Sequence, residues 1–289
     1  MRAAIPVWCA RAVWGLLPIT GGAALADATG DWSGPTAGTA TTIAWTAWAL
    51  GLLALVAPRP WGLTGLRVLA PALAIGVVLA AGAASGIGRL ALPHGVIAGA
   101  LALSAPVAAA AANALAYGDE VRYPLRVPAP LLALPVPLAA VTTSGAVIAG
   151  PMLLAAGRAF AGVVAVAVGL PVAIVLMRSL HALSRRWFVL VPAGITVVDP
   201  MTLGEPTLVR HADIAGVKQV AAGPPPGPAL DLRLGTPWSG IAVGFATPQP
   251  FARRRGRRAS ELIEADAVVV SVVGARRLAL GRRGRAAAE

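Results

Sequence analysis

The chain has 289 residues, of which 57% are hydrophobic and only 12% are charged, about half the charged share of a typical soluble domain. A water-soluble fold of this length cannot bury so much apolar surface, so the composition excludes an ordinary globular protein and favours one that faces lipid. The net charge of +12 comes almost entirely from arginine, and the single cysteine, Cys9, excludes both an intramolecular disulfide and a cysteine-based zinc site.

Residues 1–39 form an N-terminal segment that the sequence leaves ambiguous. Arg11 precedes a weak apolar run from Ala12 to Ala26, and Ala26-Asp27-Ala28 resembles the small-residue site at which signal peptides are cleaved. Pro18 interrupts this short run. The pattern fits a cleaved signal peptide, an additional marginal span or a helix lying in the membrane interface, and we expect an uncleaved apolar segment.

Residues 40–184 contain a series of long intervals without charge. A helix that crosses the hydrocarbon core needs about 20 largely apolar residues, and each interval is long enough for one helix. Helices with almost no polar face do not form the core of a soluble protein. We therefore predict an α-helical polytopic membrane bundle of about five transmembrane helices, at residues 40–57, 68–87, 95–116, 132–155 and 159–178.

The arginines of the connecting segments predict the orientation of the bundle. Cytoplasmic loops carry an excess of lysine and arginine. Every second connection is rich in arginine, whereas the others contain only Arg89 and Arg158. The arginines of the rich connections are Arg59, Arg67, Arg122, Arg126, Arg178, Arg185 and Arg186. This bias predicts a cytoplasmic C-terminal domain and, with five spans, an external N-terminus. Abundant arginine, alanine, glycine and proline suggest a GC-rich bacterial genome and hence the bacterial plasma membrane.

Residues 185–289 change to short β-type runs. Trp187–Val191 and Ile195–Val198 flank the turn Pro192-Ala193-Gly194, which is a hairpin signal. We expect a short helix over Ala259–Ala265. Several short strands at this spacing indicate a small antiparallel barrel or sandwich; the further predicted strands are Thr207–Arg210, Gly216–Val220, Ala229–Leu234, Gly240–Phe245, Ala267–Val273 and Arg277–Leu280.

Two segments carry a resemblance to a known group of proteins. The stretch Arg185-Arg-Trp-Phe-Val-Leu-Val-Pro-Ala-Gly-Ile-Thr-Val-Val-Asp-Pro-Met201 and the loop Tyr117-Gly-Asp-Glu-Val-Arg-Tyr-Pro-Leu-Arg126 are similar to segments of uncharacterised actinobacterial multi-pass membrane proteins with a C-terminal cytoplasmic domain like the pleckstrin-homology (PH) domain. The resemblance implies a PH-like fold for the tail. It implies no activity and no functional residues.

The sharpest local feature is a cluster of five arginines, Arg253, Arg254, Arg255, Arg257 and Arg258. On the cytoplasmic side they could bind anionic phospholipid headgroups, with about 1 kcal/mol from each basic residue near the surface. The alternative is a solvated loop that helps to set the topology. Without aromatic residues interleaved among the arginines, the sequence argues against nucleic-acid binding.

Other polar residues give no catalytic, cofactor or metal site. Asp119 and Glu120 are adjacent and point in different directions, so we expect loop ion pairs with arginine rather than acid–base catalysis. We expect Asn113 to form a helix–helix hydrogen bond. The three histidines, His94, His181 and His211, fall on different sides of the predicted bilayer and cannot form one metal site.

These features predict a non-enzymatic anchor, scaffold or lipid-sensing protein with a cytoplasmic PH-like module, whose partners are the lipid bilayer and proteins that the sequence does not identify. Its predicted spans contain no clear buried charge, which transporters usually have. A transporter or channel subunit is the first alternative, and a polar cavity at mid-bilayer would favour it. A membrane-embedded enzyme is the second, and a cluster of Asp, His or Ser side chains at the cytoplasmic face would favour that.

Overall fold

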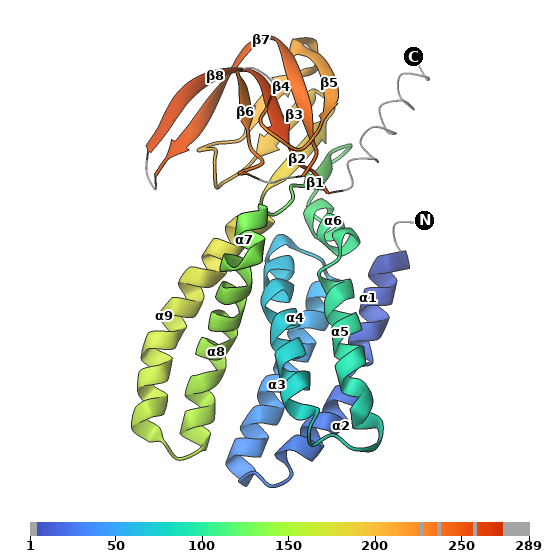
Figure 1. Cartoon of the computed structure of the whole chain (residues 1–289), viewed down its shortest axis with the longest axis vertical. Coiled ribbons are helices and arrows are strands. Elements are labelled where there is room, and N and C mark those ends of the chain that lie inside the picture. The colour runs from blue at the N-terminus through green and yellow to red at the C-terminus, as the bar shows by residue number, and fades with distance from the viewer. Residues whose placement is uncertain (1–4, 226–227, 236–237, 257–258, 274–289) are drawn as a thin grey trace. The chain divides into compact units, whose positions relative to one another are not determined.

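The computed structural model describes residues 5–273 apart from 226–227, 236–237 and 257–258 (Figure 1). The chain forms two compact units. The first comprises residues 1–111 and 135–181, and the second comprises residues 112–134 together with those from 182 onward. The segment 112–134, which the sequence analysis assigned to the helical bundle, therefore belongs to the C-terminal β unit.

The first unit is helical. Among the described residues, five helices are long and apolar enough to cross a membrane, when α1 and α2 are counted together as one. A sixth span results if η1, α5 and α6, which are bent relative to one another, form one crossing. This architecture is compatible with a multi-pass membrane protein. The helices are α1 (Ile5–Gly15), α2 (Leu17–Thr29), α3 (Gly34–Val56), α4 (Pro60–Ala80), the 3-10 helix η1 (Gly86–Leu90), α5 (Ala91–Ala102), α6 (Ala105–Asn113), α8 (Pro135–Ala155) and α9 (Ala159–Ser184).

Two helices differ from the predicted spans. Helix α4 begins at Pro60 rather than at residue 68, because proline suits the first helical turn and the charge of Arg67 does not end the helix. The predicted span 95–116 is divided into α5 and α6, which bend by 44°. Pro106 lies at the start of α6, and its missing N–H prevents one continuous helix through this point.

The N-terminal helices are part of the helical unit. Val7, Trp14 and Leu17 are buried in the same apolar cluster as Leu55 of α3 and Leu66 of α4. These two helices therefore pack as part of the helical unit, and together they are long and apolar enough for one span.

Small residues allow α4 and α5 to pack closely. A Cβ atom on Gly95 would lie 3.1 Å from Cγ2 of Val77, and one on Gly99 would lie 3.7 Å from Cβ of Ala70. The Gly95-x-x-x-Gly99 pattern therefore serves intramolecular helix packing, as such patterns do in membrane bundles.

The second unit contains two four-stranded sheets, ordered β1-β2-β3-β4 and β5-β7-β8-β6. All pairings are antiparallel except that of β6 with β8. The short helices α7 (Ala129–Ala133) and η2 (His211–Asp213) also belong to this unit. The strands are β1 (Val121–Pro124), β2 (Trp187–Val191), β3 (Gly194–Val198), β4 (Thr207–Arg210), β5 (Ile214–Val220), β6 (Ala229–Asp231), β7 (Gly240–Arg255) and β8 (Ala259–Val270).

A single apolar core fills the space between the two sheets. Alternate residues of β3 and β7 enter it, including Ile195 and Val197 from the first sheet and Val243 and Phe245 from the second, as the two-residue period of a strand requires. The predicted hairpin of β2 and β3 is confirmed. The helix predicted over Ala259–Ala265 is wrong, because these residues pair with β7 as part of β8. The predicted strand Arg277–Leu280 lies outside the described residues.

Strand β1 connects the two sheets, although it comes from the segment between α6 and α7. It pairs with β2 along one edge. Just after it, Leu125 forms a bridge with Val272, and the Arg126 N–H donates to the Ser271 carbonyl at 2.8 Å. The β unit is therefore completed by a segment that precedes α8 and α9 in the chain.

Candidate functional site

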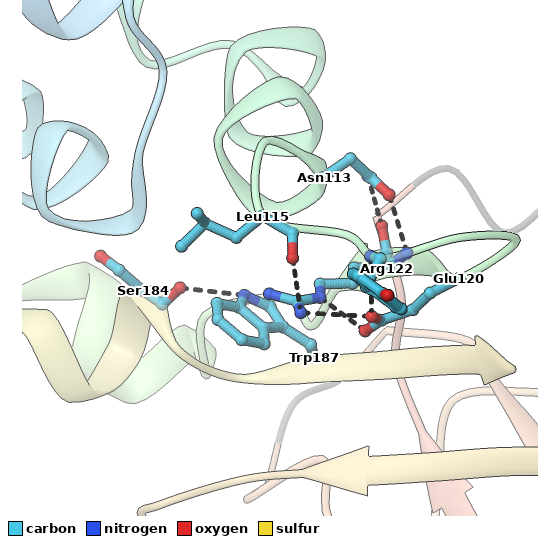
Figure 2. A network of polar contacts seen from close by, with 7 residues as sticks. Asn113, Leu115, Glu120, Arg122, Ser184 and Trp187 are labelled. Carbon is cyan, nitrogen blue, oxygen red and sulfur yellow. Dashed lines mark hydrogen bonds and ion pairs between the residues drawn. The ribbon is translucent and has the colours of Figure 1, made fainter.

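Asn113 fixes the chain between α6 and β1 (Figure 2). Its side-chain Nδ2 donates to the Arg122 carbonyl at 2.7 Å, and its Oδ1 accepts from the Arg122 N–H at 2.8 Å. The side-chain amide thus forms with the Arg122 backbone the two hydrogen bonds that a residue of a neighbouring strand would form. These bonds join a helix end to a strand, whereas the sequence analysis expected a helix–helix hydrogen bond.

An ion pair and an aromatic ring surround the side chain of Arg122 (Figure 2). Its Nε donates to Glu120 at 2.7 Å, and its guanidinium lies 4.8 Å from the centre of the Trp187 ring at the start of β2. The hydrogen bond from Arg122 lowers the pKa of the Glu120 carboxyl. The ion pair therefore contributes to the stability of the β unit at neutral pH, and this contribution is lost as the pH falls through the lowered pKa of Glu120. This is the loop ion pair expected for the acidic pair.

We expect Asn113→Ala to loosen β1 selectively. The substitution removes both hydrogen bonds to the Arg122 backbone, and two such bonds contribute about 2 kcal/mol. Hydrogen exchange of the full-length protein in detergent micelles should show faster exchange in residues 121–126, with little change in α3 and α4. Asn113→Asp keeps the acceptor for the Arg122 N–H but sets a carboxylate oxygen against the Arg122 carbonyl, so it should loosen β1 as well. Unchanged exchange in Asn113→Ala would contradict this role.

A buried ion pair joins four segments of the β unit. Arg186 lies just before β2 and donates from Nε and Nη2 to the two carboxylate oxygens of Asp199, at 2.9 and 2.8 Å. Nη2 also donates to the Leu232 carbonyl at 2.7 Å, and Nη1 donates to the Arg126 carbonyl at 3.3 Å. Arg186 is 1% exposed and Asp199 is 2% exposed. The pair is structural, since solvent and ligands do not reach it.

Three of the five predicted site arginines lie together on the hairpin of β7 and β8. Arg253, Arg254 and Arg255 end β7 and are exposed, whereas Arg257 and Arg258 lie outside the described residues. Arg255 Nε donates to Glu261 at 2.6 Å, in a pair with both side chains largely in solvent. Such an exposed pair is worth at most about 1 kcal/mol, so it leaves the arginine available to another anion.

The outer face of this hairpin combines charge with an apolar side chain. Cross-strand partners share a face, and Phe251, paired with Ile263, is fully buried. The alternate residues Arg254 and Leu262 therefore point to the opposite face, and Leu262 is 72% exposed. An arginine beside an exposed leucine suits a surface that is anionic outside and apolar beneath, such as a lipid headgroup layer.

The histidines have separate structural partners. In α5, His94 Nε2 lies 2.8 Å from the Val13 carbonyl, to which it must donate, and Nδ1 lies 2.7 Å from the Thr20 hydroxyl. In α9, His181 lies 3.0 Å from the Thr64 hydroxyl and stacks on Trp61. His211 belongs to the other unit. Among the described residues, no group of three His, Cys, Asp or Glu side chains could hold a metal ion.

Arg67 lies inside a span, where the sequence analysis expected a loop residue. It is half-buried and stands three residues after Thr64 in α4, so the two share one helix face. The signal that could have identified this position is Pro60, which permits a helix start before the arginine.

An apolar cavity of about 250 Å³ lies within the helical unit, with α1 to α4 and α8 in its walls. Two tryptophans form part of it. Pro18 has no N–H, so the Trp14 carbonyl lacks its helical donor. The Trp48 indole donates to that carbonyl, and the Trp14 indole donates to the Trp48 carbonyl, both at 3.0 Å.

Comparisons of the chain with protein-family models, with curated proteins and with solved structures gave no match. The functional argument therefore depends on the residues themselves. Among the features of the described residues that could bind a ligand are the basic hairpin of the β unit and the apolar cavity of the helical unit.

Proposed function

We propose that the protein is a non-enzymatic anchor of the bacterial plasma membrane whose cytoplasmic, PH-like β domain binds anionic phospholipid headgroups. The observation that carries this proposal is the outer end of the β7–β8 hairpin, where Arg253, Arg254 and Arg255 are exposed and Arg254 shares its face with the exposed Leu262. Cations and an apolar side chain together favour the boundary between headgroups and acyl chains.

The architecture of the β unit supports the PH-like part of the proposal. Two sheets share one core, and the segment around Leu125 bridges them. Only Arg185 and Arg186 separate the last residue of α9 from the first residue of β2. Since two residues span about 7 Å, the connection between α9 and β2 is short.

The distribution of arginine supports a cytoplasmic β domain. With six crossings, the connections on the side of the β domain contain Arg59, Arg122 and Arg126, followed by Arg185. The opposite connections contain Arg158 as their cation, together with Asp31, and Arg89 lies in η1 at the start of the bent span on that side. The positive-inside rule then assigns the β domain to the cytoplasm. Six crossings also put the N-terminus on that side, in contrast to the external N-terminus expected with five.

Transport, the alternative function, draws support from Arg67 inside α4, because an intramembrane charge commonly marks a substrate or ion pathway. The cavity of the helical unit argues against it. Its lining is dominated by apolar side chains and glycine, and Arg67 is not part of that lining. A hydrophilic substrate would find no polar pathway there, so the anchor remains the better-supported function.

Headgroup binding predicts that the hairpin approaches the bilayer only when the bilayer is anionic. A spin label on Ala259→Cys, in a Cys9→Ser background, reports this approach in full-length protein in nanodiscs. With phosphatidylglycerol present, we expect the label to be shielded from a water-soluble nickel chelate and more accessible to oxygen. In nanodiscs of phosphatidylcholine alone, the label should remain in water. Equal accessibility in both would refute the proposal.

Charge variants test whether the hairpin arginines are responsible. Replacing Arg253, Arg254 and Arg255 together by glutamine should abolish the difference between the two bilayers, because about 3 kcal/mol of headgroup attraction is lost. Replacing Arg210 and Lys218, two exposed cations elsewhere in the β domain, by glutamine is the matched control and should preserve it. If both sets had the same effect, general charge rather than this hairpin would explain the binding.

A further inference from the structure

The cavity of the helical unit lies among helices that are candidate membrane spans. Its lining residues come from the candidate spans Ile5–Thr29, Gly34–Val56, Pro60–Ala80 and Pro135–Ala155. Two of them, Trp45 and Ile148, are 48% and 36% exposed, so the cavity reaches the outer surface of the helical unit. A molecule dissolved in the bilayer can therefore enter it from the side.

The cavity offers little to water. An ordered buried water needs two to four polar partners. The most prominent polar groups of the lining are the indole N–H groups of Trp14 and Trp48, and each already donates to a backbone carbonyl. Apolar cavities of this size take up apolar ligands instead of water. The lining therefore favours an apolar occupant over water.

Three glycines line the cavity, Gly21 and Gly22 of α2 and Gly76 of α4, and a Cβ atom on any of them would meet no heavy atom within 4 Å. We consider Gly22 and Gly76, one from each helix. Glycine in the middle of a helix costs about 1 kcal/mol relative to alanine. At these positions no neighbouring helix requires its small size. A larger side chain at either position would fill the empty space beside the glycine.

We propose that this cavity binds one acyl chain of a bilayer phospholipid. The surrounding bilayer supplies such chains at high concentration, and a flexible chain fits an irregular apolar space between helices. The headgroup stays outside the cavity, so this site is separate from the basic hairpin of the β domain. Van der Waals packing rather than charge holds the chain, because transfer from lipid to an apolar cavity brings no hydrophobic gain.

A phospholipid with a diazirine on one acyl chain tests the site in full-length protein in phosphatidylcholine nanodiscs. After irradiation, peptide mass spectrometry locates the labelled residues. We expect labelling to concentrate on the cavity-lining parts of α2 and α4. The exposed face of α9, which includes Val163 and Val168 at 60% and 61% exposure, reports ordinary contact with bulk lipid. If α9 and the cavity-lining residues of the unmodified protein were labelled equally, the proposal would be overturned.

Cavity-filling variants give the second arm of the test. Gly76→Leu, and independently Gly22→Leu, should reduce labelling of the cavity about tenfold, which corresponds to about 1.4 kcal/mol of lost packing. Gly65→Leu is the control, because Gly65 is also in α4 and has open space around it but does not line the cavity. Full labelling in both cavity variants would overturn the proposal. Since the bilayer contains no anionic lipid, the outcome is independent of the hairpin.

Discussion

Replacement of Arg186 by methionine is expected to unfold or severely loosen the β unit. The substitution leaves the Asp199 carboxylate, 2% exposed, without its cation, and removing one partner of a buried pair costs about 3–5 kcal/mol. It also removes the donors for the Arg126 and Leu232 carbonyls. Hydrogen exchange of β2 and β3 in full-length protein in detergent micelles should rise sharply.

The neighbouring arginine supplies the control. Arg185 is exposed, so Arg185→Met should leave the exchange of β2 and β3 unchanged. The double variant Arg186→Met/Asp199→Leu should recover part of the protection, because buried ion pairs can be replaced by apolar residues of similar volume. If Arg186→Met and Arg185→Met behaved alike, the buried pair would not hold the β unit together.

The second large effect is expected in the helical unit, from Gly51→Ala. The added Cβ atom would overlap the indole ring of Trp14, which is 2% exposed and joined to Trp48 by two hydrogen bonds. Moving the ring breaks the hydrogen bond that its Nε1 donates to the Trp48 carbonyl, at about 1 kcal/mol, in addition to about 1–3 kcal/mol for overpacking. The apparent melting temperature of the helical unit in detergent should fall markedly.

Helix α3 contains its own control for this experiment. Gly38 belongs to the same helix, and a Cβ atom there meets nothing within 4 Å. Gly38→Ala should therefore leave the melting temperature unchanged or raise it slightly, since alanine favours a helix. A loss of stability in Gly38→Ala equal to that in Gly51→Ala would indicate general sensitivity of α3 rather than a specific contact with Trp14.

The long helices and the β2–β3 hairpin could be predicted because their signals are local. Charge-free intervals identified α3, α8 and α9, and a turn sequence between two apolar runs identified the hairpin. Arg67 misled the prediction of α4, because a single charge was taken as the end of the span. Ala259–Ala265 contains good helix formers, and only its pairing with β7 selects the strand.

The features that organise the two units were harder to predict because they depend on distant partners. Strand β1 is short, and its signal is the alternation of Val121, Tyr123 and Leu125, which a loop can also contain. Arg186 was interpreted as an arginine that sets topology, and its buried partner Asp199 is recognisable only once β2 and β3 pair. The cavity depends on which helices pack against one another. The periodicity of a single helix does not specify its neighbours.

The pairing of β1 with β2 constrains how the protein is made. Residues 121–124 leave the ribosome before α8 and α9, yet they form one sheet with residues 187–191. Both segments must therefore reach the same aqueous compartment, which requires α8 and α9 to insert as a pair that crosses and returns. Had only one of them inserted, the bilayer would separate the two strands and the sheet could not close. Closure of the first sheet thus depends on α8 and α9 ending on the same side of the bilayer as they began.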